Sequence, residues 1–220
     1  MALNKLKYNS LNLTPAANKA IGFDSDADAL EATLSGGAMT FIKKLTASSS
    51  ANLSFVNGSS DVVLDSTYKE YVFVFNNIHA QTDDTFGTFQ ASTDGGSNYN
   101  TTATTTFFAA KHDEADSATS LSYSTYNDFA QSTSFLYIQQ PLGADADQSF
   151  SGVMNLFNPS STTFITHFIS NTNTIMSGTG YSTNMYTAGY FNTTSAIDEI
   201  QFKMSSGNID AGTITLYGIS

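Results

Sequence analysis

The most constraining feature of this sequence is a repeated pattern that begins near residue 45. Short runs rich in Phe, Tyr, Val, Ile and Thr alternate with segments of Ser, Asn, Asp and Gly. The first kind of residue favours strands and the second favours turns. The pattern predicts an all-β fold, an antiparallel jelly-roll or lectin-like β-sandwich over residues 45–220. The expected strands are 53–56, 62–64, 71–78, 86–91, 104–110, 121–123, 135–138, 150–157, 164–169, 185–191, 197–204 and 213–219.

Two of these runs indicate how they are buried. Residues 71–75 are apolar on both faces, which predicts a central strand or one that faces a second chain. Near the end of the chain, Ile200, Phe202 and Met204 share one face of a strand and Glu199 lies on the other. This period of two predicts a half-buried strand.

Three segments have the composition of tight turns. Residues 92–98 contain Asp-Gly-Gly, residues 158–161 read Asn-Pro-Ser-Ser, and residues 205–212 contain Gly, Asn and Asp between the last two runs. Gly and Asn enter left-handed backbone conformations at low cost. Each segment therefore predicts a hairpin between the strands that flank it.

The first 44 residues differ from the rest in charge and pattern. They carry a net charge of +1, against −12 for residues 45–220. Asp24, Asp26 and Asp28 precede residues 29–32, and acids at a helix start favour a helix, which Gly36 would end after at most a few turns. We expect residues 1–44 to be an N-terminal attachment or oligomerisation arm with at most one short helix. Its candidate contact residues are Lys5, Lys7, Tyr8 and Lys19.

Charge and cysteine content exclude several classes of function. The chain has no Cys, which rules out disulfides and Cys-ligated metal centres. All eight basic residues are lysines, and the net charge is −11. Such a chain is repelled by phosphate and by anionic lipid, so neither nucleic acid nor a membrane is an expected partner. The first residues lack the apolar core of a signal peptide, which predicts assembly in a cytoplasm.

The sequence offers few candidates for chemistry. The spacing of Asp24, Asp26 and Asp28 begins like a calcium loop, but the required Gly and Glu are missing, and helix capping explains it better. The densest ionisable cluster is a second candidate, as a metal site or an acid–base pair, although a charged loop explains it better. Its members are His112, Glu114 and Asp116. No cofactor, metal site or catalytic residue is predicted, and the chain is not expected to be an enzyme.

Four segments carry a resemblance to a known family: the opening MALNKL, residues 89–99 (FQASTDGGSNY), residues 156–170 (LFNPSSTTFITHFIS) and residues 200–220. Together they resemble virion structural proteins of tailed bacteriophages, chiefly those of marine bacteria and cyanobacteria. The resemblance implies a tail-fibre-like component of the virion surface. It brings no catalytic residue with it.

The functional hypothesis that follows is an adhesion protein. The arm attaches to other virion proteins of the tail, collar or capsid, and loops of the sandwich contact a host-surface glycan. The candidate contact residues in those loops are Tyr181, Tyr186 and Tyr190. A homo-oligomer is expected, a trimer by analogy with fibres. The alternative is a capsid or collar decoration protein that binds no receptor, and a polysaccharide depolymerase is the least favoured.

Overall fold

The computed structural model describes residues 20–23, 30–33, 38–178 and 180–220. Within these residues all regular structure is β, and all the strand pairs are antiparallel. The chain divides into two compact units, 1–39 and 40–220. In the first unit, β1 (Ala20–Phe23) pairs with β2 (Leu30–Thr33).

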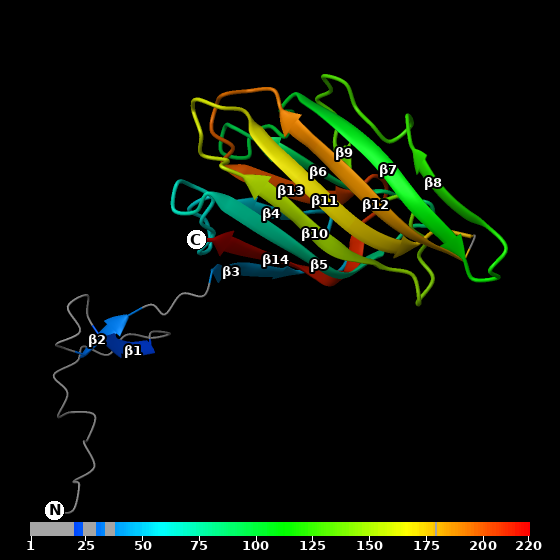
Figure 1. Cartoon of the computed structure of the whole chain (residues 1–220), viewed down its shortest axis with the longest axis horizontal. Helices are drawn as coiled ribbons and strands as arrows, with labels where there is room; N and C mark the ends of the chain where they lie inside the picture. The colour runs from blue at the N-terminus through cyan, green and yellow to red at the C-terminus, as the bar shows by residue number, and fades with distance from the viewer. Residues whose placement is uncertain (1–19, 24–29, 34–37, 179) are drawn as a thin grey trace, which may run out of the picture. The chain divides into compact units, whose positions relative to one another are not determined.

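Two sheets form the second unit, and they pack as a sandwich (Figure 1). In spatial order, the eight-stranded sheet contains β3 (Met39–Thr46), β14 (Ile209–Ile219), β5 (Glu70–Ala80), β10 (Phe150–Phe157), β11 (Thr166–Ile175), β12 (Tyr181–Phe191), β7 (Ala103–Asp113) and β8 (Thr119–Tyr123). The four-stranded sheet contains β4 (Leu53–Val56), β13 (Glu199–Met204), β6 (Gly87–Ser92) and β9 (Leu136–Tyr137). The predicted antiparallel β-sandwich is confirmed.

The core lies between the two sheets and is dominated by phenylalanine. Phe202 of β13 projects toward β5 of the other sheet, where its ring contacts Phe73 and Phe75 at centroid distances of 5.2 Å. Phe55 and Phe89 flank it within the four-stranded sheet. Each of these five rings is buried. Alternation along the strands therefore delivers one aromatic layer from each sheet, as sandwich packing requires.

The apolar run 71–75 lies in β5, in the interior of the large sheet between β14 and β10. Tyr71, Phe73 and Phe75 face the core, and Val72 on the opposite face is also buried. Figure 1 shows that the C-terminal strand β14 runs beside β5, although the two are far apart in the sequence. The prediction of a central position for this run is confirmed.

The predicted segment 62–64 is not a strand. Val62 and Leu64 are buried, but their backbone follows a turn in which Gly58 N–H donates to the Val62 carbonyl at 2.9 Å. Leu64 N–H donates to the side chain of Asn57. These apolar side chains fill the core from a loop. A buried loop residue is apolar like a buried strand residue, so the sequence pattern alone did not distinguish the two.

The helix expected after Asp24, Asp26 and Asp28 is also not found in the described residues, since 30–33 form strand β2. Four residues are too few for a stable helix, whereas pairing with β1 satisfies the backbone groups directly. Residues 24–29 lie outside the described residues. At the other end of the predicted arm, 39–44 belong to strand β3 of the large sheet.

Two of the three predicted hairpins connect different sheets instead. Residues 92–98 lie between β6 and β7, and the predicted turn 205–212 shortens to residues 205–208 between β13 and β14, because β14 begins at Ile209. Gly95 and Gly96 have the expected positive φ angles of 70° and 75°. Only the segment 158–161 joins paired strands, β10 and β11. Turn chemistry sets local backbone angles, but it does not determine which sheet the next strand joins.

Candidate functional site

Exposed apolar side chains gather on the large sheet. Of the described large hydrophobic residues that are exposed, all but Tyr126 and Phe164 belong to its strands. They are Met39, Phe41, Phe108, Leu121, Tyr123, Val153, Ile169 and Tyr186. A sheet face that packs on nothing usually carries polar residues, so this outward face is a candidate interaction surface. It is the face turned toward the viewer in Figure 1.

Strand register arranges these side chains in rows across the outward face. One row crosses five neighbouring strands from β10 to β8 and consists of Val153, Asn171, Tyr186, Phe108 and Tyr123. Within it, the rings of Phe108 and Tyr186 stack at 4.8 Å with an interplanar angle of 10°. Direct cross-strand neighbours interact in this way because their side chains leave the sheet at the same point.

The next row has small residues at its centre. Ala188 pairs with Ile169 on one side and with Thr106 on the other. Beyond it, His167 and Tyr190 form an edge-to-face contact at 6.1 Å. Because Ala188 is short, a shallow hollow of about 420 Å³ opens over it. The hollow is lined by Thr104, Thr105, Thr106, His167, Phe168, Ile169, Ala188, Gly189 and Tyr190.

No Asp, Glu or Lys lines this hollow. Its polar groups are hydroxyls and an imidazole. The Thr104 hydroxyl accepts hydrogen bonds from the Gln131 side chain at 2.8 Å and from the Gln131 backbone at 3.1 Å, so its own proton is available to a ligand. Thr106 is exposed and makes one long hydrogen bond of 3.4 Å to the Ala188 carbonyl. The hollow therefore offers hydroxyl donors beside apolar and aromatic surface, with no fixed charge.

The three predicted tyrosines all lie on strand β12, and the prediction that they lie in loops is wrong. Tyr186 and Tyr190 both lie on the outward face, four residues apart along the strand, and of the two only Tyr190 lines the hollow. Tyr181 does not join them. It lines a second hollow with Lys111 and Met176 near the β7–β8 turn. The expected strand 185–191 already included Tyr186 and Tyr190, which conflicted with placing them in loops. Only Tyr181 lay outside that strand, because β12 begins at Tyr181 and not at Met185.

Sequence reasoning missed Phe108 and His167 as members of this surface. Phe108 was included in a predicted strand, and alternation alone places it opposite the buried Phe107. The available signal was two adjacent Phe residues, one of which must face outward. His167 lies within the predicted strand 164–169, and nothing in the sequence indicates which face of that strand it occupies. The arm residues Lys5, Lys7, Tyr8 and Lys19 lie outside the described residues.

Lys111 is the main ionisable group of the second hollow. Its amine lies 3.7 Å from the Met176 sulfur, and burial lowers the pKa of Lys111 below the ordinary lysine value. Among the described residues, no lysine lies within 4 Å of a carboxylate. The hollow combines one lysine with hydroxyls of the β8 strand.

The cluster of His112, Glu114 and Asp116 forms part of the β7–β8 turn. His112 Nε2 lies 3.1 Å from Asp116, and both side chains are exposed. Asp113, between them, accepts hydrogen bonds from the Ser117 and Ala118 backbone at 2.8 Å and from the Ser117 hydroxyl. The Ser117 hydroxyl bond is the main cause that lowers the pKa of Asp113. In the part of the chain that the structure describes, no three His, Asp or Glu side chains form a group that could hold a metal ion.

A buried carboxyl group lies on the four-stranded sheet. Glu199 is 1% exposed, and it accepts a hydrogen bond from the Tyr99 hydroxyl at 2.8 Å. Burial raises the pKa of Glu199, and the nearby Asp198 and Asp94 raise it further, while the Tyr99 bond opposes the change. The backbone of Gly96 covers the carboxylate so closely that a Cβ there would lie 2.0 Å from it. A substrate therefore has no access to this group.

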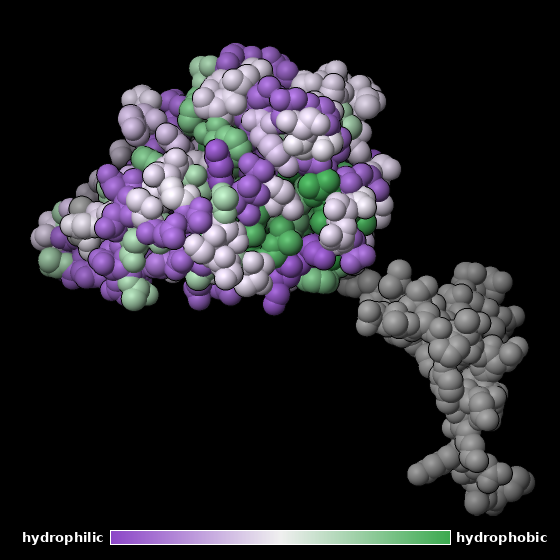
Figure 2. Space-filling model, turned by 180° about the vertical axis from the view of Figure 1, so that it is seen from behind, coloured by the Kyte–Doolittle hydropathy of each residue, from purple (hydrophilic) through white to green (hydrophobic). Residues whose placement is uncertain are grey.

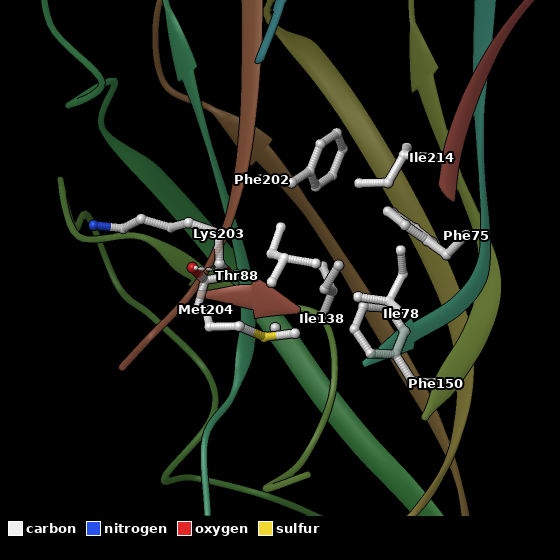
Figure 3. Close-up of a pocket in the computed structure, with 11 residues that line it drawn as sticks. Phe75, Ile78, Thr88, Ile138, Phe150, Phe202, Lys203, Met204 and Ile214 are labelled. Atoms are coloured by element: carbon white, nitrogen blue, oxygen red, sulfur yellow. Dashed lines mark hydrogen bonds between the residues drawn. The ribbon is translucent and has the colours of Figure 1, made fainter. Parts of the chain in front are cut away.

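The interior also contains a small cavity between the sheets. Figure 3 shows the rings of Phe75, Phe150 and Phe202 directed into it, while the amine of Lys203 points away. Its volume is about 10 Å³, at the lower limit for a single water molecule. We interpret it as a packing gap. Figure 2 shows that hydrophilic and hydrophobic residues are intermixed on the side of the molecule opposite the view of Figure 1.

Comparison with known proteins adds no relative. No family model, curated protein or solved structure matches the chain. Among the described residues, no helical segment has the length and hydrophobicity needed to span a membrane.

Proposed function

We propose that this chain is a structural and adhesive component of a bacteriophage virion, tail-fibre-like, whose β-sandwich binds a neutral host-surface glycan through the hollow over Ala188. The observation that supports glycan binding is the hollow itself, which contains no Asp, Glu or Lys and is bounded by Tyr190, His167 and Ile169. The virion half is supported by the sequence resemblance described above. The proposal assigns the chain no reaction.

A sugar ring matches the groups that the hollow presents. Pyranose rings have an apolar C–H face, which packs on aromatic and aliphatic side chains, and hydroxyls that exchange hydrogen bonds with Thr and His. Tyr190 and Ile169 supply the first kind of surface, and Thr104 and Thr106 supply the second. A shallow open site binds weakly by itself, so adhesion depends on many copies acting together.

Binding to a panel of neutral and acidic oligosaccharides tests this proposal. We expect binding to neutral members, weakened about tenfold in Tyr190→Ala, which corresponds to roughly 1.4 kcal/mol. Val153→Ala is the matched control, because Val153 is exposed on the same face but does not line the hollow. Equal binding by both variants, or binding to acidic sugars alone, would reject the proposed site.

A decoration protein is the second candidate, and the apolar rows of the outward face favour it. The stacked Phe108 and Tyr186 form the type of apolar surface that protein interfaces bury. Electron microscopy of intact particles distinguishes the two functions. Density on the capsid lattice supports decoration, and density on the tail supports adhesion.

A further inference from the structure

Strand β8 forms an edge of the large sheet among the described residues. It pairs with β7 on one side and is the last strand in the sheet order. All five of its residues are exposed, including Leu121 at 74% and Tyr123 at 52%. The Ser124 N–H bonds to the Phe107 carbonyl. By antiparallel alternation, the backbone groups of Thr119, Leu121 and Tyr123 therefore point away from β7.

This edge lacks the features that normally prevent strands from pairing with other chains. Native edges carry lysine, proline or a bulge. The edge strand β3 at the other side of the sheet has Lys43 and Lys44. By contrast, β8 reads Thr-Ser-Leu-Ser-Tyr and pairs with β7 in unbroken register. The free side of β8 is thus an open template for another strand.

Charge indicates which partner fits. The chain has a net charge of −11, so two copies repel each other over most of their surface. Residues 117–127, which contain β8 and its flanks, include no charged side chain. An uncharged edge lets a second copy approach with little repulsion. It also lacks the carboxylates that would attract a basic partner to this edge.

We propose that β8 pairs antiparallel with β8 of a second copy, about a two-fold axis at Leu121. This register places Leu121 opposite its own copy and Thr119 opposite Tyr123, so every outward backbone group of the three residues has a partner. A shift by one residue leaves some of them unpaired. Such a contact is isologous and closed, so it forms a dimer and does not extend into a filament.

Pairing joins the outward faces of the two copies. Adjacent strands of one sheet keep their side-chain alternation, so the row that ends at Tyr123 continues into the second copy. Both Ala188 hollows then lie on the same side of one continuous sheet. A contact limited to one short strand buries less than the roughly 1,200 Å² of a standard interface, and the dimer is therefore weak and concentration-dependent.

The absence of Cys makes a crosslinking test direct. In the full chain, Leu121→Cys places two thiols directly opposite each other, with Cα atoms about 5.5 Å apart, a separation typical of disulfides. We expect mild oxidation to give a covalent dimer. Thr119→Cys is the matched control on the same strand, because its partner is Tyr123 and its own copy is too distant. Equal crosslinking of both variants, or none in Leu121→Cys, overturns the proposed register.

Sedimentation of the full chain over a concentration series provides the second test. Leu121→Lys puts two like charges opposite each other and is expected to abolish the dimer. Ile169→Lys adds the same charge to the outward face, away from β8, and should leave the dimer intact. Loss of association only in Ile169→Lys, or a trimer that Leu121→Lys does not disturb, contradicts the proposal. Both residues are exposed, so thermal unfolding should confirm that each variant folds.

Discussion

At the level of single residues, Glu199 connects stability to pH. Its pKa is raised mainly by burial, so the folded state binds its proton more tightly than the unfolded chain does. The stability that this group contributes is therefore fully present below the unfolded pKa, and it is lost as the pH rises through the folded pKa. Glu199 makes the protein less stable in neutral than in mildly acidic solution.

Substitution of Glu199 by Gln should remove this dependence. Gln keeps an acceptor for the Tyr99 hydroxyl but cannot ionise. We expect the stability of the variant relative to the natural protein to increase from pH 4 to pH 7. Urea unfolding across this range measures the difference. A stability difference that is the same at every pH would show that the pKa of Glu199 does not differ between the folded and unfolded states.

Tyr99→Phe is the companion variant. The Tyr99 hydroxyl stabilises the ionised form of Glu199, so its removal should raise the folded-state pKa of Glu199 further. The loss of stability would then begin at the same pH and continue to higher pH. The same urea series detects the displacement. An unchanged profile would mean that the hydrogen bond does not act on the charge of Glu199.

Glu199 also shows what the sequence could not provide. Strand alternation correctly placed Ile200, Phe202 and Met204 in the core and put Glu199 on the opposite face. What covers that face is the Gly96 loop, which is distant in the sequence. Alternation describes the two faces of one strand, and it contains no information on which loop folds over the outer face.

At the level of elements, Phe202 holds the two sheets together. Its ring contacts Phe73 and Phe75 from the large sheet. Phe202→Ala removes these contacts and leaves a cavity, so we expect the free energy of unfolding to fall by about 3–5 kcal/mol. Phe164→Ala is the control, because Phe164 is exposed, and it should change stability by less than about 0.5 kcal/mol. Equal effects in denaturant unfolding would contradict this assignment of the core.

The sequence predicted most individual strands but not how they pair. Most strands were predicted because runs of Phe, Tyr, Val and Thr mark them individually. Strand β3 was assigned to the arm, since Lys43 and Lys44 interrupt its alternation and the charge balance suggested a boundary beyond them. The hollow over Ala188 depends on the pairing of β11, β12 and β7. β11 and β12 are consecutive, but β7 lies far from both in the sequence, and no local pattern gives the register between such distant strands. The site could therefore not be assembled from sequence.

At the level of the whole molecule, polarity comes from hydroxyls and amides more than from ion pairs. Among the described residues, the ion pairs within 4 Å are His79–Asp210 and His112–Asp116. Salt therefore has few favourable pairs to weaken, and it screens the repulsion of a net charge of −11. We expect the melting temperature to stay constant or rise as sodium chloride increases from about 0.05 to about 0.5 M, a range over which the Debye length falls roughly threefold. A clear fall, measured by calorimetry, would reveal stabilising ion pairs.

The position of β3 gives a prediction about where the folded unit begins. Residues 40–220 form a compact unit, and β3 supplies the sheet neighbour of β14. A chain that begins at Met39 keeps this strand and should unfold cooperatively at the temperature of the full chain. A chain that begins at Leu45 loses most of β3 and leaves the backbone edge of β14 unpaired, without the two lysines of β3 to protect it.

We therefore expect the chain that begins at Leu45 to be less stable and to aggregate on heating, as light scattering during thermal unfolding would detect. The comparison also bears on the expected attachment of the arm to a virion, which is part of the hypothesis. Removal of residues 1–38 leaves every strand of the sandwich in place, so if the proposed virion role is right, failure of this chain to enter particles would be a property of residues 1–38. Removal of residues 1–44 would combine that loss with damage to the sandwich. If both shortened chains melt together, β3 does not stabilise the sheet and the folded unit begins later.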